Sequence, residues 1–171
     1  MPQPFTETGQ IVDPLHREVY AGTIRVRDGR IAGIERHPVS DGAPVILPGF
    51  IDAHVHVESS MLTPSEFARA AVRHGTVATV SDPHEIANVL GVEGVEYMIA
   101  DGGRVPFTFS FGAPSCVPAT PFETAGATLS PDDVAALLDR PEVRYLSEVM
   151  NYPGVLNGDP DMQAKIDAAK A

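Results

Sequence analysis

The sequence predicts an α/β fold in which strands alternate with helices behind a short all-β segment. From Leu47 onward, β-branched or alternating runs are each followed by a stretch with helical spacing, and this pattern occurs four times. Before it, residues 20–27 and 30–34 alternate apolar and polar side chains on either side of Asp28-Gly29, a pair typical of a tight hairpin turn. Four strand–helix units favour a parallel sheet with helices packed outside it.

The elements are expected in the following order. Residues 10–36 form short strands, and residues 37–44 form a polar loop. Thr63-Pro64-Ser65-Glu66 has the form of a capping box with proline at the first helical position, and Gly75 ends the helix that follows. Four strands are expected after Leu47: the first begins at Phe50, and the other three cover residues 76–81, 106–112 and 143–149. The helices of this part cover residues 64–74, 91–100, 130–139 and the segment from 159 to the terminus.

Composition narrows the classes of function. At 171 residues the chain is long enough to bury a core, and 43% hydrophobic with 20% charged residues is typical of a soluble globular protein. Its 23 acidic against 12 basic side chains give a net charge of −11, the wrong sign for binding nucleic acid or an anionic membrane. The single cysteine, Cys116, excludes an internal disulfide. With no apolar run of about 18 residues and no signal-like start at Met1–Pro4, a cytoplasmic protein is expected.

His54-Val55-His56 is the motif most indicative of chemistry. Successive side chains of an extended strand point to opposite faces, so the two imidazoles are expected to share a face. Imidazole is a common ligand of divalent metals, and two on one rigid strand would suit such an ion. Asp52 is expected on the same face, where it either orients a histidine ring or is a polar residue without a role at the site.

Four blocks of sequence carry a family resemblance. Residues 48–62 begin with Pro-Gly-Phe-Ile-Asp-Ala-His-Val-His, which resembles the first barrel strand of the amidohydrolase superfamily. Together with residues 81–89, 114–120 and 147–155, they resemble the adenine deaminase branch of that superfamily. The resemblance extends from about Gly9 to the C-terminus.

The resemblance implies the amino-terminal half of a (β/α)₈ TIM-type barrel, preceded by a short β-sandwich segment of the amidohydrolase type. Residues 1–46 would form a small β part of the composite β-sandwich, and residues 47–171 the first four β/α units of the metal-dependent barrel. A complete barrel needs about 250 residues, and the family's enzymes are several times longer than this chain. The remaining strands and ligands are expected in a longer sequence, which leaves the first and fourth strands here as unpaired edges.

The same resemblance implies a hydrolase of purine salvage, in which water activated by a divalent metal attacks C6 of adenine and gives hypoxanthine and ammonia. It implies a manganese or iron pair, with zinc possible, and a homo-oligomer once the barrel is complete. Two alternatives remain open: the chain alone is a non-catalytic fragment, because its ligands fall short of a closed site, or the activity is on another cyclic amide. Zinc deaminases with a Pro-Cys-x-x-Cys motif are excluded, because the chain has one cysteine.

Candidate site residues follow the expected strands, where parallel-barrel enzymes carry their reacting groups. His54 and His56 are the expected metal ligands, and the resemblance makes Glu148 the carboxylate that bridges two metals. Glu148, Asp82 and Glu85 are the catalytic candidates, for proton transfer or for an accessory metal; Asp82 and Glu85 are expected in a tight turn. Candidates for the substrate pocket are Glu58, Ser59, His84, Ser115 and Cys116.

Overall fold

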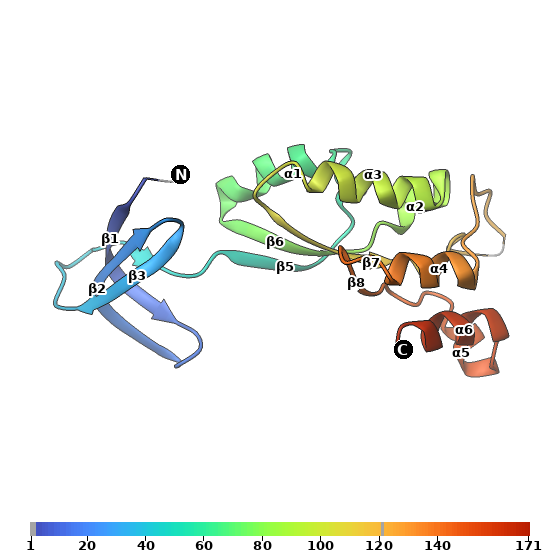
Figure 1. Cartoon of the computed structure of the whole chain (residues 1–171). Helices are drawn as coiled ribbons and strands as arrows, with labels where there is room; N and C mark the ends of the chain where they lie inside the picture. Colours follow the sequence, from blue (N-terminus) through green and yellow to red (C-terminus); the bar gives the residue numbers. More distant parts are fainter. Residues whose placement is uncertain (1–2, 121) are drawn as a thin grey trace. The chain divides into compact units, whose positions relative to one another are not determined.

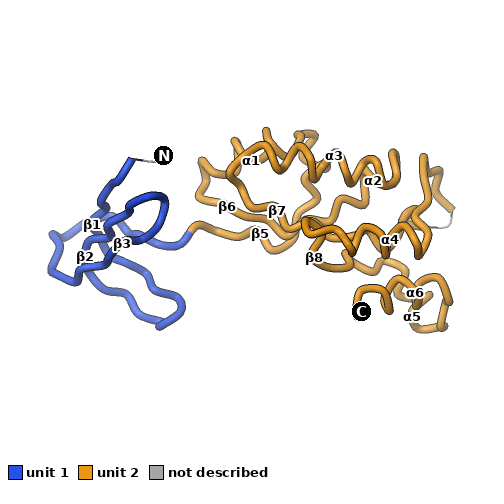
Figure 2. Tube along the Cα trace, viewed as in Figure 1, with its two compact units in different colours: residues 1–48 blue, residues 49–171 orange. Residues whose placement is uncertain are grey.

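The chain forms two compact units, residues 1–48 and residues 49–171 (Figure 2). The computed structural model describes residues 3–120 and 122–171. The sequence predicts no signal segment at Met1–Pro4, and residues 1 and 2 of that segment lie outside the described residues.

The first unit is a small mixed sheet. Its strand order is β3-β2-β1-β4, with β1 antiparallel to β2, β2 antiparallel to β3, and β1 parallel to β4. Asp28 and Gly29 both have positive φ, 53° and 72°, as the expected tight turn between β2 and β3 requires. The strands are β1 (Phe5–Asp13), β2 (Glu18–Arg27), β3 (Arg30–Arg36) and β4 (Val45–Ile46).

The second unit is built on a parallel sheet, which confirms the predicted α/β class. The strands are paired in sequence order, β5-β6-β7-β8, so that β5 and β8 form the two ends of the sheet. The strands are β5 (Phe50–Val55), β6 (Thr76–Ser81), β7 (Thr108–Ala113) and β8 (Val143–Leu146).

Helices connect these strands and cover the sheet. Helices α1, α2 and α3 lie along one face of it, and α4 packs against β7 and β8 (Figure 1). The buried core includes Val95 and Met98 of α3, Phe111 of β7, and Val134 and Leu137 of α4. The helices are α1 (Pro64–Ala71), α2 (His84–Leu90), α3 (Val92–Gly102), α4 (Pro131–Leu138), α5 (Tyr152–Asn157) and α6 (Pro160–Ala168), with 3₁₀ turns η1 (Val57–Ser60) and η2 (Val72–His74).

Two helices were not predicted. Helix α2 begins at His84, where the sequence predicts a tight turn, and Asp82 Oδ1 accepts a hydrogen bond from the His84 backbone N–H at 3.2 Å. Gly91, with φ of 65°, separates α2 from α3. Helix α5 begins after Asn151, whose side chain accepts a hydrogen bond from the Gly154 N–H. Both helices are short, seven and six residues, so the apolar spacing within each is too brief to mark a helix in the sequence.

The capping box predicted at Thr63 is wrong. Thr63 is the residue before α1 and Pro64 is the first helical residue, but the Thr63 side chain makes no capping hydrogen bond. The Ser65 backbone N–H instead donates to Asp101 Oδ2 of α3 at 2.7 Å. A distant carboxylate therefore satisfies the N–H group that a local cap would have taken.

Candidate metal centre

The carboxyl ends of the parallel strands bring polar side chains to one edge of the sheet. His54 lies near the end of β5 and His56 directly after it. Asp82 follows β6, and Glu148 lies two residues beyond the end of β8. This edge is where parallel α/β sheets carry their binding sites.

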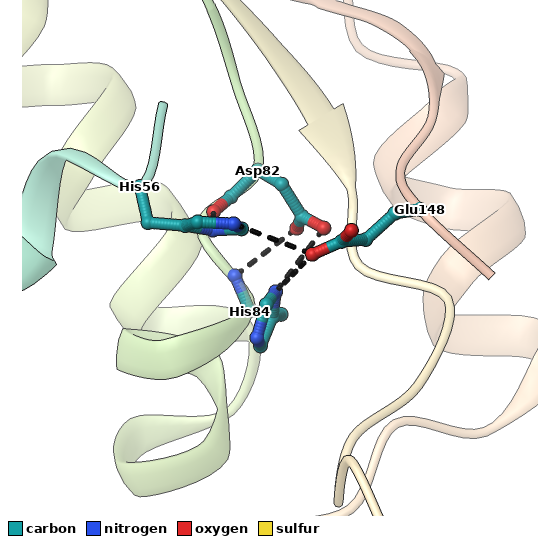
Figure 3. A group of neighbouring side chains, drawn as sticks. All are labelled: His56, Asp82, His84 and Glu148. Atoms are coloured by element: carbon teal, nitrogen blue, oxygen red, sulfur yellow. Dashed lines mark hydrogen bonds and ion pairs between the residues drawn. The ribbon is translucent and has the colours of Figure 1, made fainter. Parts of the chain in front are cut away.

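Four side chains meet there and form the four-residue cluster of His56, Asp82, His84 and Glu148 (Figure 3). His56 Nε2 lies 3.3 Å from Glu148 Oε1. His84 Nδ1 lies 3.1 Å from Asp82 Oδ2 and 3.8 Å from Glu148 Oε1. One potential ligand atom from each residue lies within 4.8 Å of all the others, which is close enough for one ion to contact them together.

Two atoms of the cluster are buried without a hydrogen bond within the part of the chain that the structure describes, namely Asp82 Oδ2 and His84 Nδ1. They are 3.1 Å apart but poorly aligned for a hydrogen bond with each other. Buried polar atoms are normally paired, because an unpaired one costs about 1–3 kcal/mol. Imidazole nitrogens and carboxylate oxygens without a thiolate suit manganese, iron and zinc. The cluster therefore fits a divalent cation.

A hydrogen bond to the main chain orients the imidazole of His56. Its Nδ1 lies 2.8 Å from the backbone carbonyl oxygen of Asp82. In the neutral ring, Nδ1–H donates to this carbonyl and leaves the lone pair of Nε2 facing Glu148. A histidine that ligates a metal is held in this way.

His54 lies beside the cluster. Its Nε2 is 3.2 Å from His56 Nε2 and 3.7 Å from Glu148 Oε2, and its side chain is 60% exposed against 21% for His56. The His54 backbone N–H donates to Asp52 Oδ1 at 3.1 Å, so Asp52 holds the main chain of His54. The two oxygens of Glu148 thus face different histidines.

The acids of the site shift the protonation of their neighbours. The Asp82 carboxylate raises the pKa of His84, burial of the ring opposes this effect, and Glu148 and Glu85 add to it. Burial raises the pKa of Glu58, although a hydrogen bond from the Ile86 N–H opposes the shift. The field at the cluster therefore favours positive charge, as a protonated ring or as a cation.

Glu58, Ser59 and Glu85 lie close to the cluster in sequence but connect η1 to α2. Ser59 Oγ donates a hydrogen bond to the Glu85 carboxylate. Glu58 Oε1 accepts one from the backbone N–H of Ile86 at 3.2 Å. These contacts fix the segment after His56 against the segment after Asp82, and a catalytic or pocket role for the three residues stays a prediction.

Ser115 and Cys116 follow β7 and are both buried. Ser115 Oγ donates to the backbone oxygen of Glu148 at 2.6 Å, and Cys116 Sγ accepts from the Asn151 N–H at 3.3 Å. Both residues line a cavity of about 630 Å³. A separate cavity of about 130 Å³ is lined by residues that include His54, Asp82 and Glu148. Ser115 thus contacts the main chain of Glu148, and its predicted pocket role concerns a different cavity from the one beside the cluster.

Two residues beside the site were not predicted. Tyr145 Oη lies 2.9 Å from the carbonyl oxygen of Ser81 and 2.8 Å from that of Ser110, so its single hydroxyl hydrogen is shared between the two and the side chain links β8 to β6 and β7. Burial raises the pKa of Tyr145 to about 12. Lys165 of α6 is 7% exposed, and its Nζ donates to the Ser115 carbonyl at 3.0 Å. No sequence signal marks Lys165, because a lysine in a polar helix is normally solvated.

Comparison with known proteins identifies the family of the chain. A family model described as the amidohydrolase family matches residues 45–171. The chain belongs to the amidohydrolase family. Members of this family are metal-dependent, and the four-residue cluster lies within the matched region.

The relatives of this amidohydrolase chain include proteins described as adenine deaminases. The adenine deaminase of Salinibacter ruber is 66% identical over 99% of this chain, which covers 31% of that relative. The adenine deaminase of Sulfurovum sp. is 63% identical over 94% of the chain, which covers 30% of that relative. The chain therefore spans somewhat less than a third of the length of these curated relatives.

A solved structure supports the fold of this amidohydrolase. It is the structure of an N-acetyl-D-glucosamine-6-phosphate deacetylase mutant from Mycobacterium smegmatis, with a TM-score of 0.57 and 14% sequence identity. The match covers 98% of this chain and 48% of the deacetylase. Among the helices of the described residues, none is both long and apolar enough to cross a membrane.

Proposed function

We propose that this chain is the amino-terminal part of an adenine deaminase, which converts adenine and water to hypoxanthine and ammonia. The observation that carries the proposal is the identity to relatives described as adenine deaminases, which extends over nearly the whole chain. The cluster at the carboxyl edge of the sheet supports it, because hydrolysis at an aromatic carbon needs an activated water. Purine salvage in the cytoplasm and self-association of the complete protein belong to the same proposal.

In this proposal His54, His56 and Glu148 would hold a divalent cation, and His84 would lie beside them, next to the same oxygen of Glu148 as His56. Support comes from the carboxylate of Glu148, whose Oε2 faces His54 while its Oε1 faces His56 and His84. A carboxylate with its two oxygens directed at different ligand groups suits a pair of cations. The donor set is compatible with manganese or iron and also with zinc.

A cation held there would supply a nucleophilic water near neutral pH. Over the reaction the bond from C6 to the exocyclic amino nitrogen is replaced by a bond from C6 to the oxygen of water, and the amino group leaves as ammonia with a proton that the water supplies. Asp82 is the best placed of the catalytic candidates to move that proton, because its Oδ2 is buried at the cluster and makes no hydrogen bond within the described residues. The negative charge of the Glu148 carboxylate stabilises positive charge at the cluster. Glu85, which is hydrogen-bonded to Ser59 of η1, is the second candidate for proton transfer.

The same proposal includes the architecture of the complete protein. We take β5 to β8 as the first half of a (β/α)₈ barrel, whose remaining strands come from a longer sequence. The likeness to the deacetylase supports this, because it covers nearly all of this chain and about half of the solved one. Residues 1–46 would then supply part of a β-sandwich beside the barrel.

The test combines metal content with turnover. The protein that contains this chain at the length of its relatives, and the 171-residue chain itself, are each assayed for bound metal and for conversion of adenine to hypoxanthine by absorbance. We expect turnover by the longer protein and its loss in the Glu148→Gln variant. Glu66→Gln, on the exposed surface of α1, is the matched control and should retain full activity.

Two outcomes would contradict the proposal. If the longer protein binds metal and hydrolyses a cyclic amide but leaves adenine unchanged, the substrate assignment fails. If Glu148→Gln retains both metal and turnover, the cluster is not the active site. Turnover by the 171-residue chain with stoichiometric metal would instead show that the fragment alone is catalytic.

A further inference from the structure

The chain contains two lysines, Lys165 and Lys170, and they differ sharply in environment. Lys170 is exposed, with its Nζ 3.4 Å from Asp167. Lys165 is buried in α6, and burial lowers its pKa. A lysine is rarely buried without a partner, because removing an ammonium from water is costly. The partner of Lys165 is the backbone carbonyl of Ser115, 3.0 Å from Nζ.

Ser115 connects Lys165 to the main chain of Glu148 at the candidate metal centre. Its carbonyl accepts from Lys165, while its hydroxyl donates to the Glu148 carbonyl at 2.6 Å. The loop after β7 is thus fixed on one side to α6 and on the other to the residue that carries the carboxylate. Two further hydrogen bonds join the loop after β7 to the loop after β8. The Ser147 N–H donates to Ala113 O at 2.8 Å, and the Asn151 N–H donates to Cys116 Sγ at 3.3 Å.

Glu148 itself needs such support. It lies beyond the end of β8, where the strand ladder no longer fixes the backbone, and its side chain is 37% exposed. Its carboxylate must nevertheless stay within reach of His56, whose Nε2 is 3.3 Å away. A ligand on a loop is held in place only by the contacts that fix that loop.

We propose that Lys165 and Ser115 are positioning residues, which fix the main chain of Glu148 so that its carboxylate reaches the histidines. This inference rests on the proposed metal role of Glu148. It assigns Ser115 to the support of Glu148 and gives a function to a buried lysine on a helix that contributes no side chain to the cluster.

The test uses Lys165→Met and Ser115→Ala, with Lys170→Met as the control. Methionine keeps the length and packing of the lysine stem without its charge. Manganese binding, measured by calorimetry with Mn²⁺ alone, should weaken about tenfold in each positioning variant and stay unchanged in the control. Because both residues act through the same loop, the double variant should weaken binding by less than the product of the single effects.

A second readout does not depend on metal. Hydrogen–deuterium exchange of the metal-free chain should become faster in residues 147–151 in both variants, while β6 exchanges as in the wild type. Faster exchange throughout the second unit, or wild-type exchange in residues 147–151, would overturn the proposal. If exchange in residues 147–151 rises locally but the wild-type protein, at the length of its relatives, binds neither manganese nor iron nor zinc, the positioning stands and the proposed function fails. Mn²⁺ binding that Glu148→Gln abolishes but both positioning variants retain would leave the function standing and refute the positioning.

Discussion

Replacing Gly112 by alanine should disrupt the packing behind the candidate metal centre. Gly112 lies in β7, and a Cβ there would come within 2.5 Å of Tyr145 Cε2 and would also collide with Ser147 Oγ. Carbon atoms prefer a separation of about 3.5–4.0 Å, so the ring would have to move by about 1 Å. It cannot do so freely, because Tyr145 Oη is bound to Ser81 and Ser110.

The magnitude follows from these two effects. Overpacking costs about 1–3 kcal/mol and a lost hydrogen bond about 0.5–1.5 kcal/mol, so Gly112→Ala should lower the free energy of unfolding by roughly 2–4 kcal/mol. Urea unfolding followed by circular dichroism measures this value. Gly103→Ala is the matched control, because its Cβ would meet nothing nearer than 3.5 Å and its φ is −67°. A free energy for Gly112→Ala within about 0.5 kcal/mol of the wild type would refute the reasoning.

Three further predictions concern stability and use the same unfolding assay. Leu137→Ala should cost about 2–5 kcal/mol, because Leu137 is 1% exposed in the core, whereas the exposed Leu156→Ala should cost little. Ser130→Ala removes the cap of α4 and should cost about 1 kcal/mol; an unchanged value would mean that Asp133 alone suffices. Burial raises the pKa of Asp101, but hydrogen bonds led by the Ser65 N–H outweigh it and hold that pKa below 3.8. The ionised group therefore stabilises the fold above pH 3.8, and this stabilisation is lost as the pH falls through the lowered pKa. Asp101→Asn should be roughly 1 kcal/mol less stable than the wild type well above that pH and equal to it well below; a constant difference would contradict this.

Local patterns in the sequence were sufficient for much of the fold. Alternation on either side of Asp28-Gly29 predicted the hairpin, whose turn residues have the required positive φ. The repeated change from strand to helix spacing predicted the parallel sheet. Both signals come from residues that are neighbours in the chain, and the covalent geometry of the backbone turns such patterns directly into structure.

Short and distant features were not predictable in this way. Helix α2 was missed, and with it the orientation of His84, which joins the cluster through contacts with Asp82 and Glu148. The capping box at Thr63 was predicted from a local motif, but the structure satisfies that helix end with Asp101. Helix α2 has only seven residues, fewer than a periodic pattern needs, and Asp101 lies 36 positions from its partner Ser65, outside the window that a local pattern covers.

The sequence by itself determined the α/β class, the order of the strands and the polar residues at their carboxyl ends, His54, His56 and Glu148 among them. Only the tertiary structure decided which of these side chains meet and what supports them. His56 and Glu148 are 92 positions apart (148 − 56), and the contacts of Ser115 with Glu148 and with Lys165 span 33 and 50 positions. Such contacts depend on how the strands stack side by side and how α6 packs, and no periodicity in the chain encodes either.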